Sequence, residues 1–149
     1  MQYGTDEQVG EFPLHIPSVS VSSIGIGGGS IATLGALGVV RVGPESAGSN
    51  PGPACYGRGG TRPTTTDVNL ILGLLNPDFF LGGEMTLDLE ASREAVRVHV
   101  ADPLGLSVDD AAQAISEIVN NNMANASHLV TTRRGLDPRD FALVAAGGA

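Results

Sequence analysis

The sequence predicts an α/β protein, because runs typical of strands and runs typical of helices both occur along the chain. Residues 19–24 place β-branched residues between serines, the period of two expected of a half-buried strand. Residues 115–130 carry apolar side chains at helical spacing. Residues 141–146 form an unbroken apolar run, which is typical of a strand buried on both faces.

The composition indicates a folded soluble protein of one domain, and it narrows the possible partners. The chain has 149 residues, of which 42% are hydrophobic and 16% charged. Its net charge of −8 disfavours a nucleic-acid surface and an anionic membrane. A nucleotide site stays possible, because main-chain amides and a metal ion can supply the positive field. With no membrane-length apolar run, no signal-like start and only Cys55, we expect a cytoplasmic location.

A glycine-rich turn follows the first predicted strand. Four glycines occur within five positions and a serine closes the turn: Gly25, Gly27, Gly28, Gly29 and Ser30. Glycine allows close approach to main-chain N–H groups, and successive N–H groups form a concave nest for phosphate oxygens. The turn is therefore either a phosphate grip or a tight turn without a ligand.

A predicted hairpin accompanies this turn. Residues 31–34 are short and apolar, residues 35–38 are typical of a turn, and residues 39–42 indicate a second strand. A dinucleotide-binding Rossmann site is disfavoured, because that fingerprint needs a helix directly after the glycines and Gly35 and Gly38 would interrupt it.

Residues 43–60 are dense in glycine and proline, yet they hold side chains that a passive linker rarely needs. We expect an ordered functional loop. Arg58 is either a phosphate or carboxylate contact or one half of a surface ion pair. Cys55 is either a small buried apolar residue or a nucleophile, and the absence of a neighbouring histidine favours burial.

Threonines and Asp67 precede a predicted helix over residues 68–75. In the first turn, the Asp67 carboxylate would offset the helix dipole, and this capping role suffices to explain it. The alternative is that Asp67 faces the glycine turn and holds a magnesium-bound water. An aromatic turn at residues 77–83 is expected to plug the core.

Two further helices are predicted. Asp88 caps one over residues 89–101, which residues 103–106 break. The longest helix starts with a capping-box-like pair, Ser107 and Asp110, and ends at Gly135. It carries a run of asparagines that face either a ligand, another domain or solvent: Asn120, Asn121, Asn122 and Asn125.

The chain stops inside a second glycine turn, Gly147–Gly148, directly after the predicted strand over residues 141–146. Such a turn normally leads into another element, so we expect the chain to be part of a longer protein, incomplete at both ends.

Several longer motifs resemble the hydantoinase A / 5-oxoprolinase family, from about residue 16 to residue 149. Six motifs occur along this chain in the same order as in the family: Ser23–Ala32, Arg41–Gly48, Asn50–Thr61, Asp78–Gly83, Asn122–Ala126 and Arg134–Phe141.

This resemblance implies an actin-like, ribonuclease-H-related ATPase fold with a phosphate-binding hairpin turn. Family members use ATP and Mg2+ to phosphorylate a cyclic amide or an enolate oxygen, for hydrolysis or for carboxylation. The expected partners are a cyclic amide of the hydantoin or 5-oxoproline type and a second, hydantoinase B-type subunit or domain. The alternatives are a ketone carboxylase subunit and a non-catalytic piece that only packs against other subunits.

The expected site combines the residue-based alternatives above with what the resemblance implies for the two glycine turns. Asp67 is the expected catalytic residue and metal ligand, and Arg58 and Asn125 are the expected phosphate or substrate contacts. The expected nucleotide-binding residues are the two glycine turns: Gly25, Gly27, Gly28, Gly29, Ser30, Gly147 and Gly148.

Overall fold

The computed structural model describes residues 3–4, 7–9, 12–14, 18–19, 23–142 and 144. Its N-terminal part forms two short antiparallel pairs, β1 (Tyr3–Gly4) with β4 (Ser18–Val19) and β2 (Glu7–Val9) with β3 (Phe12–Leu14). The strand predicted over residues 19–24 is only partly testable. Val19 lies in β4, Ser23 and Ile24 lie in no strand, and residues 20–22 lie outside the described residues.

The predicted hairpin is confirmed. It consists of β5 (Ser30–Leu34) and β6 (Val40–Ser46), which pair antiparallel with Ala32 opposite Val42. The turn between them is closed by the N–H of Gly35, which donates to the Val39 carbonyl at 2.9 Å. The glycine turn leads directly into β5, so the position of this turn is set by the hairpin.

The short helix after the glycine- and proline-rich loop is α1 (Thr65–Ile71), and the loop itself contains the 3-10 turn η1 (Ala54–Tyr56). Thr64 is the N-cap, and together with Asp67 it forms a complete capping box. The helix therefore begins a few residues earlier than the apolar pattern predicts, because the cap and not the first apolar residue sets its start.

The second helical segment is α2 (Leu89–Val96), followed without interruption by a π-helical turn η3 (Arg97–Ala101) and by α3 (Asp102–Leu104). Its predicted cap is confirmed, since the Asp88 carboxylate accepts from the Ala91 N–H at 2.9 Å. The predicted break over residues 103–106 is confirmed, although the helical segment passes through Pro103 before it ends. Proline is tolerated in the first turn of α3, and the segment ends at Gly105, whose φ is +66°.

The longest helix is α4 (Val108–Thr132), with 25 residues. Ser107 caps it as predicted by accepting from the Asp110 N–H at 3.1 Å, and Gly135 follows its end with a φ of +67°. Two 3-10 turns complete the described elements, η2 (Leu81–Gly83) and η4 (Pro138–Asp140).

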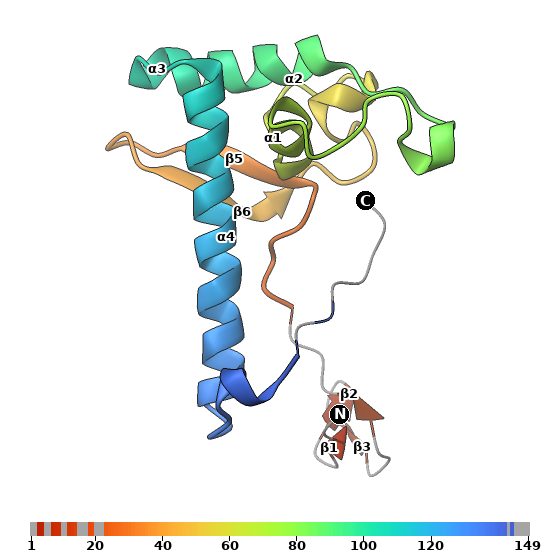
Figure 1. Ribbon diagram of the computed structural model, residues 1–149, viewed down its shortest axis with the longest axis vertical. Coiled ribbons are helices and arrows are strands. Elements are labelled where there is room, and N and C mark those ends of the chain that lie inside the picture. Colours follow the sequence, from red (N-terminus) through yellow and green to blue (C-terminus); the bar gives the residue numbers. More distant parts are fainter. Residues whose placement is uncertain are drawn as a thin grey trace.

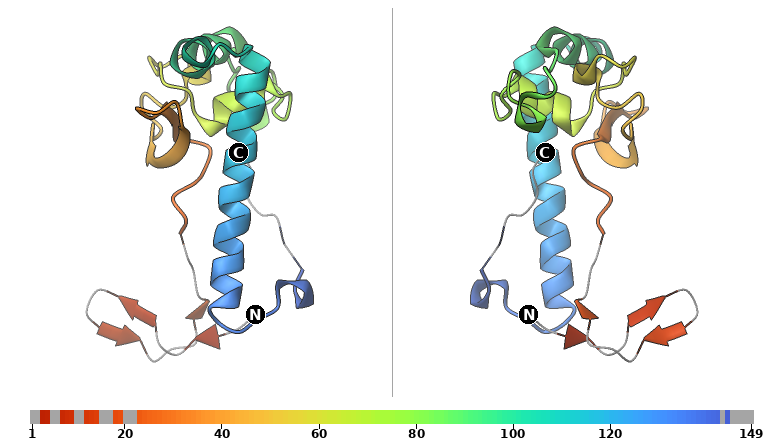
Figure 2. Two further views of the ribbon diagram at one scale, coloured as in Figure 1. Left: turned by 90° about the vertical axis from the view of Figure 1, so that its left-hand side faces the viewer. Right: turned by 90° about the vertical axis from the view of Figure 1, so that its right-hand side faces the viewer.

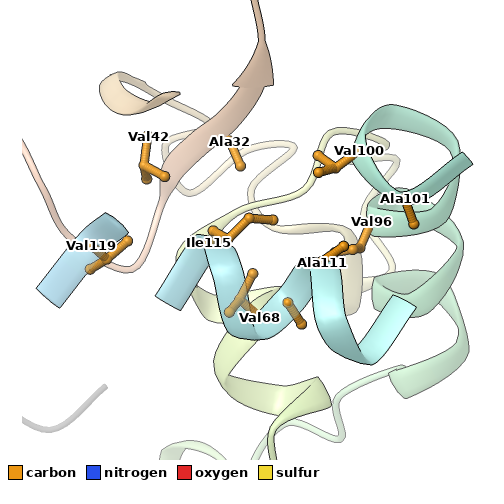
Figure 3. Packing of buried hydrophobic residues seen from close by; sticks show 10 residues of the cluster. Ala32, Val42, Val68, Val96, Val100, Ala101, Ala111, Ile115 and Val119 are labelled. Atoms are coloured by element: carbon orange, nitrogen blue, oxygen red, sulfur yellow. The ribbon is translucent and has the colours of Figure 1, made fainter. Parts of the chain in front are cut away.

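The main core lies where the hairpin, α1, α2, η3 and the first half of α4 meet (Figure 3). It is built from small and β-branched side chains: Ala32, Val42, Val68, Val96, Val100, Ala101, Ala111, Ala112, Ile115 and Val119. A second cluster forms under the aromatic turn, where Phe80 packs with Cys55, Leu70 and Leu87. Phe80 therefore plugs the core as predicted.

The two halves of α4 differ in their surroundings. The first half is packed, whereas the second half stands clear of α1 and α2 (Figures 1 and 2). Its apolar stripe continues there without cover, and Leu129 is 50% exposed.

The strand predicted over residues 141–146 is not found among its described residues. Phe141, Ala142 and Val144 lie in no strand and are exposed, Val144 to 81%. A run that is apolar on both faces needs neighbouring strands, and none of the described residues pairs with it. Among the described helices, none combines the length and apolar character needed to cross a membrane.

Candidate functional site

The glycine turn is held in shape by Ser30. The Ser30 hydroxyl accepts from the Gly27 N–H at 2.9 Å and donates to the Gly25 carbonyl at 3.4 Å. In return, the Ser30 N–H donates to the Gly27 carbonyl at 3.0 Å. The serine that closes the motif is therefore a structural clamp inside the turn.

The carbonyl groups of the turn are anchored to its neighbours, whereas two of its N–H groups are not. The Gly28 carbonyl accepts from the Thr66 N–H at 2.8 Å, and the Gly29 carbonyl accepts from the Ala47 N–H at 2.9 Å. The N–H groups of Gly28 and Gly29 donate to no acceptor within the described part of the chain. Two consecutive free N–H groups on a fixed turn are able to hold an anionic oxygen.

Close packing also explains why two of these positions are glycine. A Cβ at Gly28 would lie 2.7 Å from the Thr66 Oγ1, and one at Gly29 would lie 2.8 Å from the Ser46 Oγ. A Cβ at Gly27 would meet nothing within 4 Å. The tight turn without a ligand and the phosphate grip are thus both compatible with the backbone geometry.

A cleft of about 350 Å³ opens beside the glycine turn. The turn contributes Ile26, Gly27 and Gly28 to its wall. The helix α1 and the turn after it contribute five more residues: Thr65, Thr66, Asn69, Leu74 and Leu75. The middle of α4 closes the opposite side with Ser116, Val119, Asn120 and Met123. Every residue of this lining is uncharged.

Asp67 is fully buried and lies at the junction of three segments. Its Oδ2 accepts from the Thr64 N–H at 2.9 Å, the Thr64 hydroxyl at 2.7 Å and the Ala54 N–H at 3.2 Å. Its Oδ1 accepts from the Cys55 N–H and from the Ser92 hydroxyl, both at 2.8 Å. The capping interpretation is confirmed, and the carboxylate joins α1 to η1 and to α2 in addition.

The expectation that Asp67 faces the glycine turn is wrong. Its five donors come from residues 54, 55, 64 and 92, and none comes from the turn. A magnesium-bound water at this carboxylate would require these hydrogen bonds to break. Within residues 23–142, no group of three or more His, Cys, Asp or Glu side chains is placed to hold a metal ion.

Similarity to known proteins extends over the whole chain. The family profile for hydantoinase/oxoprolinase matches residues 1–149, the whole chain. The chain belongs to the hydantoinase/oxoprolinase family. It is 47% identical over 147 residues to the caprolactamase subunit alpha of Pseudomonas jessenii, covering 99% of this chain and 21% of that one.

A second relative and one solved structure are also similar to this chain. The acetophenone carboxylase gamma subunit of Aromatoleum aromaticum is 44% identical over 142 residues, covering 95% of this chain and 19% of that subunit. The crystal structure of the ATP-dependent caprolactamase from Pseudomonas jessenii superposes with a TM-score of 0.83 at 46% identity, covering 97% of this chain and 21% of that one. The chain thus spans about a fifth of the length of these relatives.

The remaining expected site residues are dispersed. Arg58 lies in the loop, where its guanidinium donates to the Ser49 carbonyl at 3.5 Å and lies 6.0 Å from the centre of the Tyr56 ring. Asn125 is exposed on α4 and is not part of the cleft wall. Gly147 and Gly148 lie outside the described residues.

Cys55 is buried, as the burial interpretation predicts. It is 1% exposed, and burial raises the pKa of its thiol to about 12, with the nearby Asp67 charge adding to the effect. A thiol with so high a pKa is protonated at neutral pH and is a poor nucleophile.

Sequence reasoning missed most of the cleft wall. Asn69 and Ser116 lie on two different helices and are 47 positions apart along the chain, whereas Asn120 was already among the asparagines expected to face a ligand, another domain or solvent. A signal for part of it was present, because Ser116 and Asn120 are four residues apart and therefore lie on one face of α4.

Proposed function

We propose that this chain is part of a longer ATP-dependent enzyme that hydrolyses cyclic amides. The observation that carries the proposal is the family match over the whole chain, together with the 47% identity to a caprolactamase subunit. Phosphate transfer from ATP to the amide oxygen makes the ring carbon more electrophilic, and the C–N bond then breaks after attack by water. Ring opening consumes one water, and the release of phosphate consumes another.

Within such an enzyme, the glycine turn would hold phosphate oxygens through the free N–H groups of Gly28 and Gly29. This role agrees with an actin-like ATPase fold, in which we place the hairpin β5–β6 as the phosphate-binding hairpin. Amides that are fixed before the ligand arrives stabilise developing charge without reorganisation.

The described residues fit ATP in part and do not fit its magnesium ion. Two free N–H groups suit a phosphate oxygen, but the cleft wall holds no arginine and no carboxylate. Magnesium prefers carboxylate and phosphate oxygens with several waters. We therefore assign no magnesium ligand within residues 23–142, and no step of the proposed reaction is attributed to the ion.

A ketone carboxylase is the second candidate, and the 44% identity to an acetophenone carboxylase subunit favours it. In that case an enolate oxygen would be phosphorylated in place of an amide oxygen. Both relatives are named as subunits, so a second subunit, for instance of hydantoinase B type, is part of the proposal.

The test is made on the full-length protein with its partner subunit. ADP release is measured with caprolactam, hydantoin or 5-oxoproline, and separately with acetone or acetophenone plus bicarbonate. Amide-dependent ADP release together with a ring-opened product in the mass spectrum supports the hydrolase. Ketone-dependent release with a carboxylated product supports the second candidate, and release with neither contradicts both.

A further inference from the structure

Three neutral polar side chains converge on the cleft without a protein partner. Asn69 reaches it from α1, and Ser116 and Asn120 reach it from α4. None of the three side chains forms a hydrogen bond with any residue in the part of the chain that the structure describes. An asparagine amide offers both hydrogen-bond donors and an acceptor. This wall can therefore both donate hydrogen bonds to a ligand and accept them from it.

The position of these groups follows from the packing of α4. Ile115 and Val119 point into the core (Figure 3), and Val119 also borders the cleft. Ser116 and Asn120 each follow a core residue by one position, and one position corresponds to about 100° of helix rotation. They therefore lie beside the core stripe, on the side that the cleft occupies.

The charge of the cleft argues against a polyphosphate at this wall. All eight basic residues of the chain are arginines, and none of them lines the cleft. Protein sites for transferring phosphates usually combine amides with a cation. The asparagine wall offers no cation, and its neighbours Ile26 and Met123 are apolar. The wall therefore suits an uncharged, partly apolar ligand.

The size agrees with a small ligand. Ligand pockets commonly enclose about 300–1,000 Å³, and a cleft of about 350 Å³ lies at the small end of that range. Gly27 and Gly28 border the same cleft, so a carbonyl oxygen bound there would lie beside the phosphate-holding turn.

We propose that this cleft binds the neutral carbonyl substrate, a small cyclic amide, and that Asn69 and Asn120 determine its specificity by hydrogen bonding to the amide. The apolar residues Ile26 and Met123 would contact the ring carbons. The identification of the ligand as a cyclic amide rests on the proposed function. The preference of the asparagine wall for a neutral group rests on its own uncharged side chains and not on the proposed function.

The experiment compares Asn120→Ala with Asn121→Ala in the full-length protein with its partner subunit. Both residues are exposed asparagines on α4, but only Asn120 borders the cleft. Loss of one hydrogen bond to the ligand costs about 0.5–1.5 kcal/mol, which corresponds to about a two- to tenfold rise in KM. We expect this rise for the amide in Asn120→Ala, with KM for ATP unchanged, and no change of either KM in Asn121→Ala.

Equal behaviour of the two variants would overturn the proposal, as would a rise in KM for ATP alone. Binding of caprolactam and of acetophenone is also measured by saturation-transfer NMR, which needs no turnover. If caprolactam binds without turnover and Asn120→Ala alone abolishes the signal, the proposed function fails and the cleft assignment stands. If only acetophenone behaves in this way, the neutral carbonyl site stands with a ketone as its ligand. If the wild-type protein binds neither compound, the proposal is wrong.

Discussion

The Ser92 hydroxyl of α2 donates a hydrogen bond of 2.8 Å to the Oδ1 of Asp67 in α1, and both side chains are fully buried. The same carboxylate accepts from two N–H groups of η1. The side chain of Asp67 thus joins the two helices and the loop between β6 and α1.

This arrangement predicts that Asp67→Asn destabilises the chain strongly. The asparagine amide would turn an NH2 group toward N–H donors that now meet an oxygen, and each buried donor without an acceptor costs about 1–3 kcal/mol. We expect a loss of about 3 kcal/mol in the free energy of unfolding, measured by urea denaturation. Ser92→Ala removes one hydrogen bond and should cost about 1 kcal/mol.

The outcome separates a structural from a metal-binding role for Asp67. An Asp67→Asn protein of unchanged stability that has lost magnesium-dependent activity would contradict the structural role and support the metal-binding alternative.

The glycine turn predicts a contrast between two neighbouring glycines. Gly28→Ala would place a Cβ 2.7 Å from the Thr66 Oγ1, so the buried threonine must shift, and we expect a loss of about 1 kcal/mol. Gly27→Ala meets nothing within 4 Å and should leave the unfolding free energy unchanged. Thermal unfolding of the two variants side by side tests this, and equal melting temperatures would contradict it.

The ATP affinity of the same two variants, Gly27→Ala and Gly28→Ala, provides a second test of the turn. If the turn grips phosphate, Gly28→Ala should also weaken ATP binding in the full-length protein, as measured by calorimetry. If ATP affinity stays the same, the turn is only a structural turn.

The buried thiol predicts a loss of stability in alkaline solution. The pKa of Cys55 is raised from an ordinary value of 9.0 to about 12. Below the ordinary value the thiol is protonated in both states, so its contribution to stability is fully present. Above it the unfolded chain releases the proton before the folded chain does, so the free energy of unfolding falls as the pH rises toward the folded pKa.

The measurement is the urea midpoint across this pH window for the wild-type chain and for Cys55→Ala. We expect the midpoint to fall more steeply with pH in the wild-type chain. Parallel slopes, or rapid alkylation of the folded chain by iodoacetamide near neutral pH, would contradict the burial of the thiol.

The uncovered stripe of α4 predicts self-association of the chain. Leu129 is half exposed and continues the apolar stripe of the packed half, and exposed apolar patches promote association. Leu129→Ser should lower the weight-average mass in sedimentation at micromolar concentration. Asn121→Ser, on the same helix, is the control and should change nothing. A wild-type chain that sediments as a monomer would refute this prediction.

The features that the sequence predicts well depend on neighbours along the chain. Asp88, Ser107 and the turn at residues 35–38 act within three or four positions, so local patterns locate them correctly. The long helix is found for the same reason, because its apolar stripe repeats within a few turns.

The features that local patterns do not reveal depend on distant residues. Asp67 reads as a helix cap, but three of its five hydrogen bonds reach back to residues 54–55 or forward to Ser92. The cleft wall needs α1 and α4 side by side before Asn69 and Asn120 can face one ligand. The described residues of the run expected to form a strand, Phe141, Ala142 and Val144, lie in no strand for a related reason, since apolar character alone does not provide neighbouring strands.

The continuity of α4 has a mechanical consequence. Twenty-five residues at about 1.5 Å each make a helix of roughly 37 Å, which packs into the core over its first half and is largely exposed over its second half. Asn120 lies near the middle of α4, directly after Val119, the last residue of the helix that is part of the main core. Displacement of the exposed half of α4 would therefore tilt the whole helix. Because residues in the middle of α4 line the cleft, this tilt would change the width of the cleft.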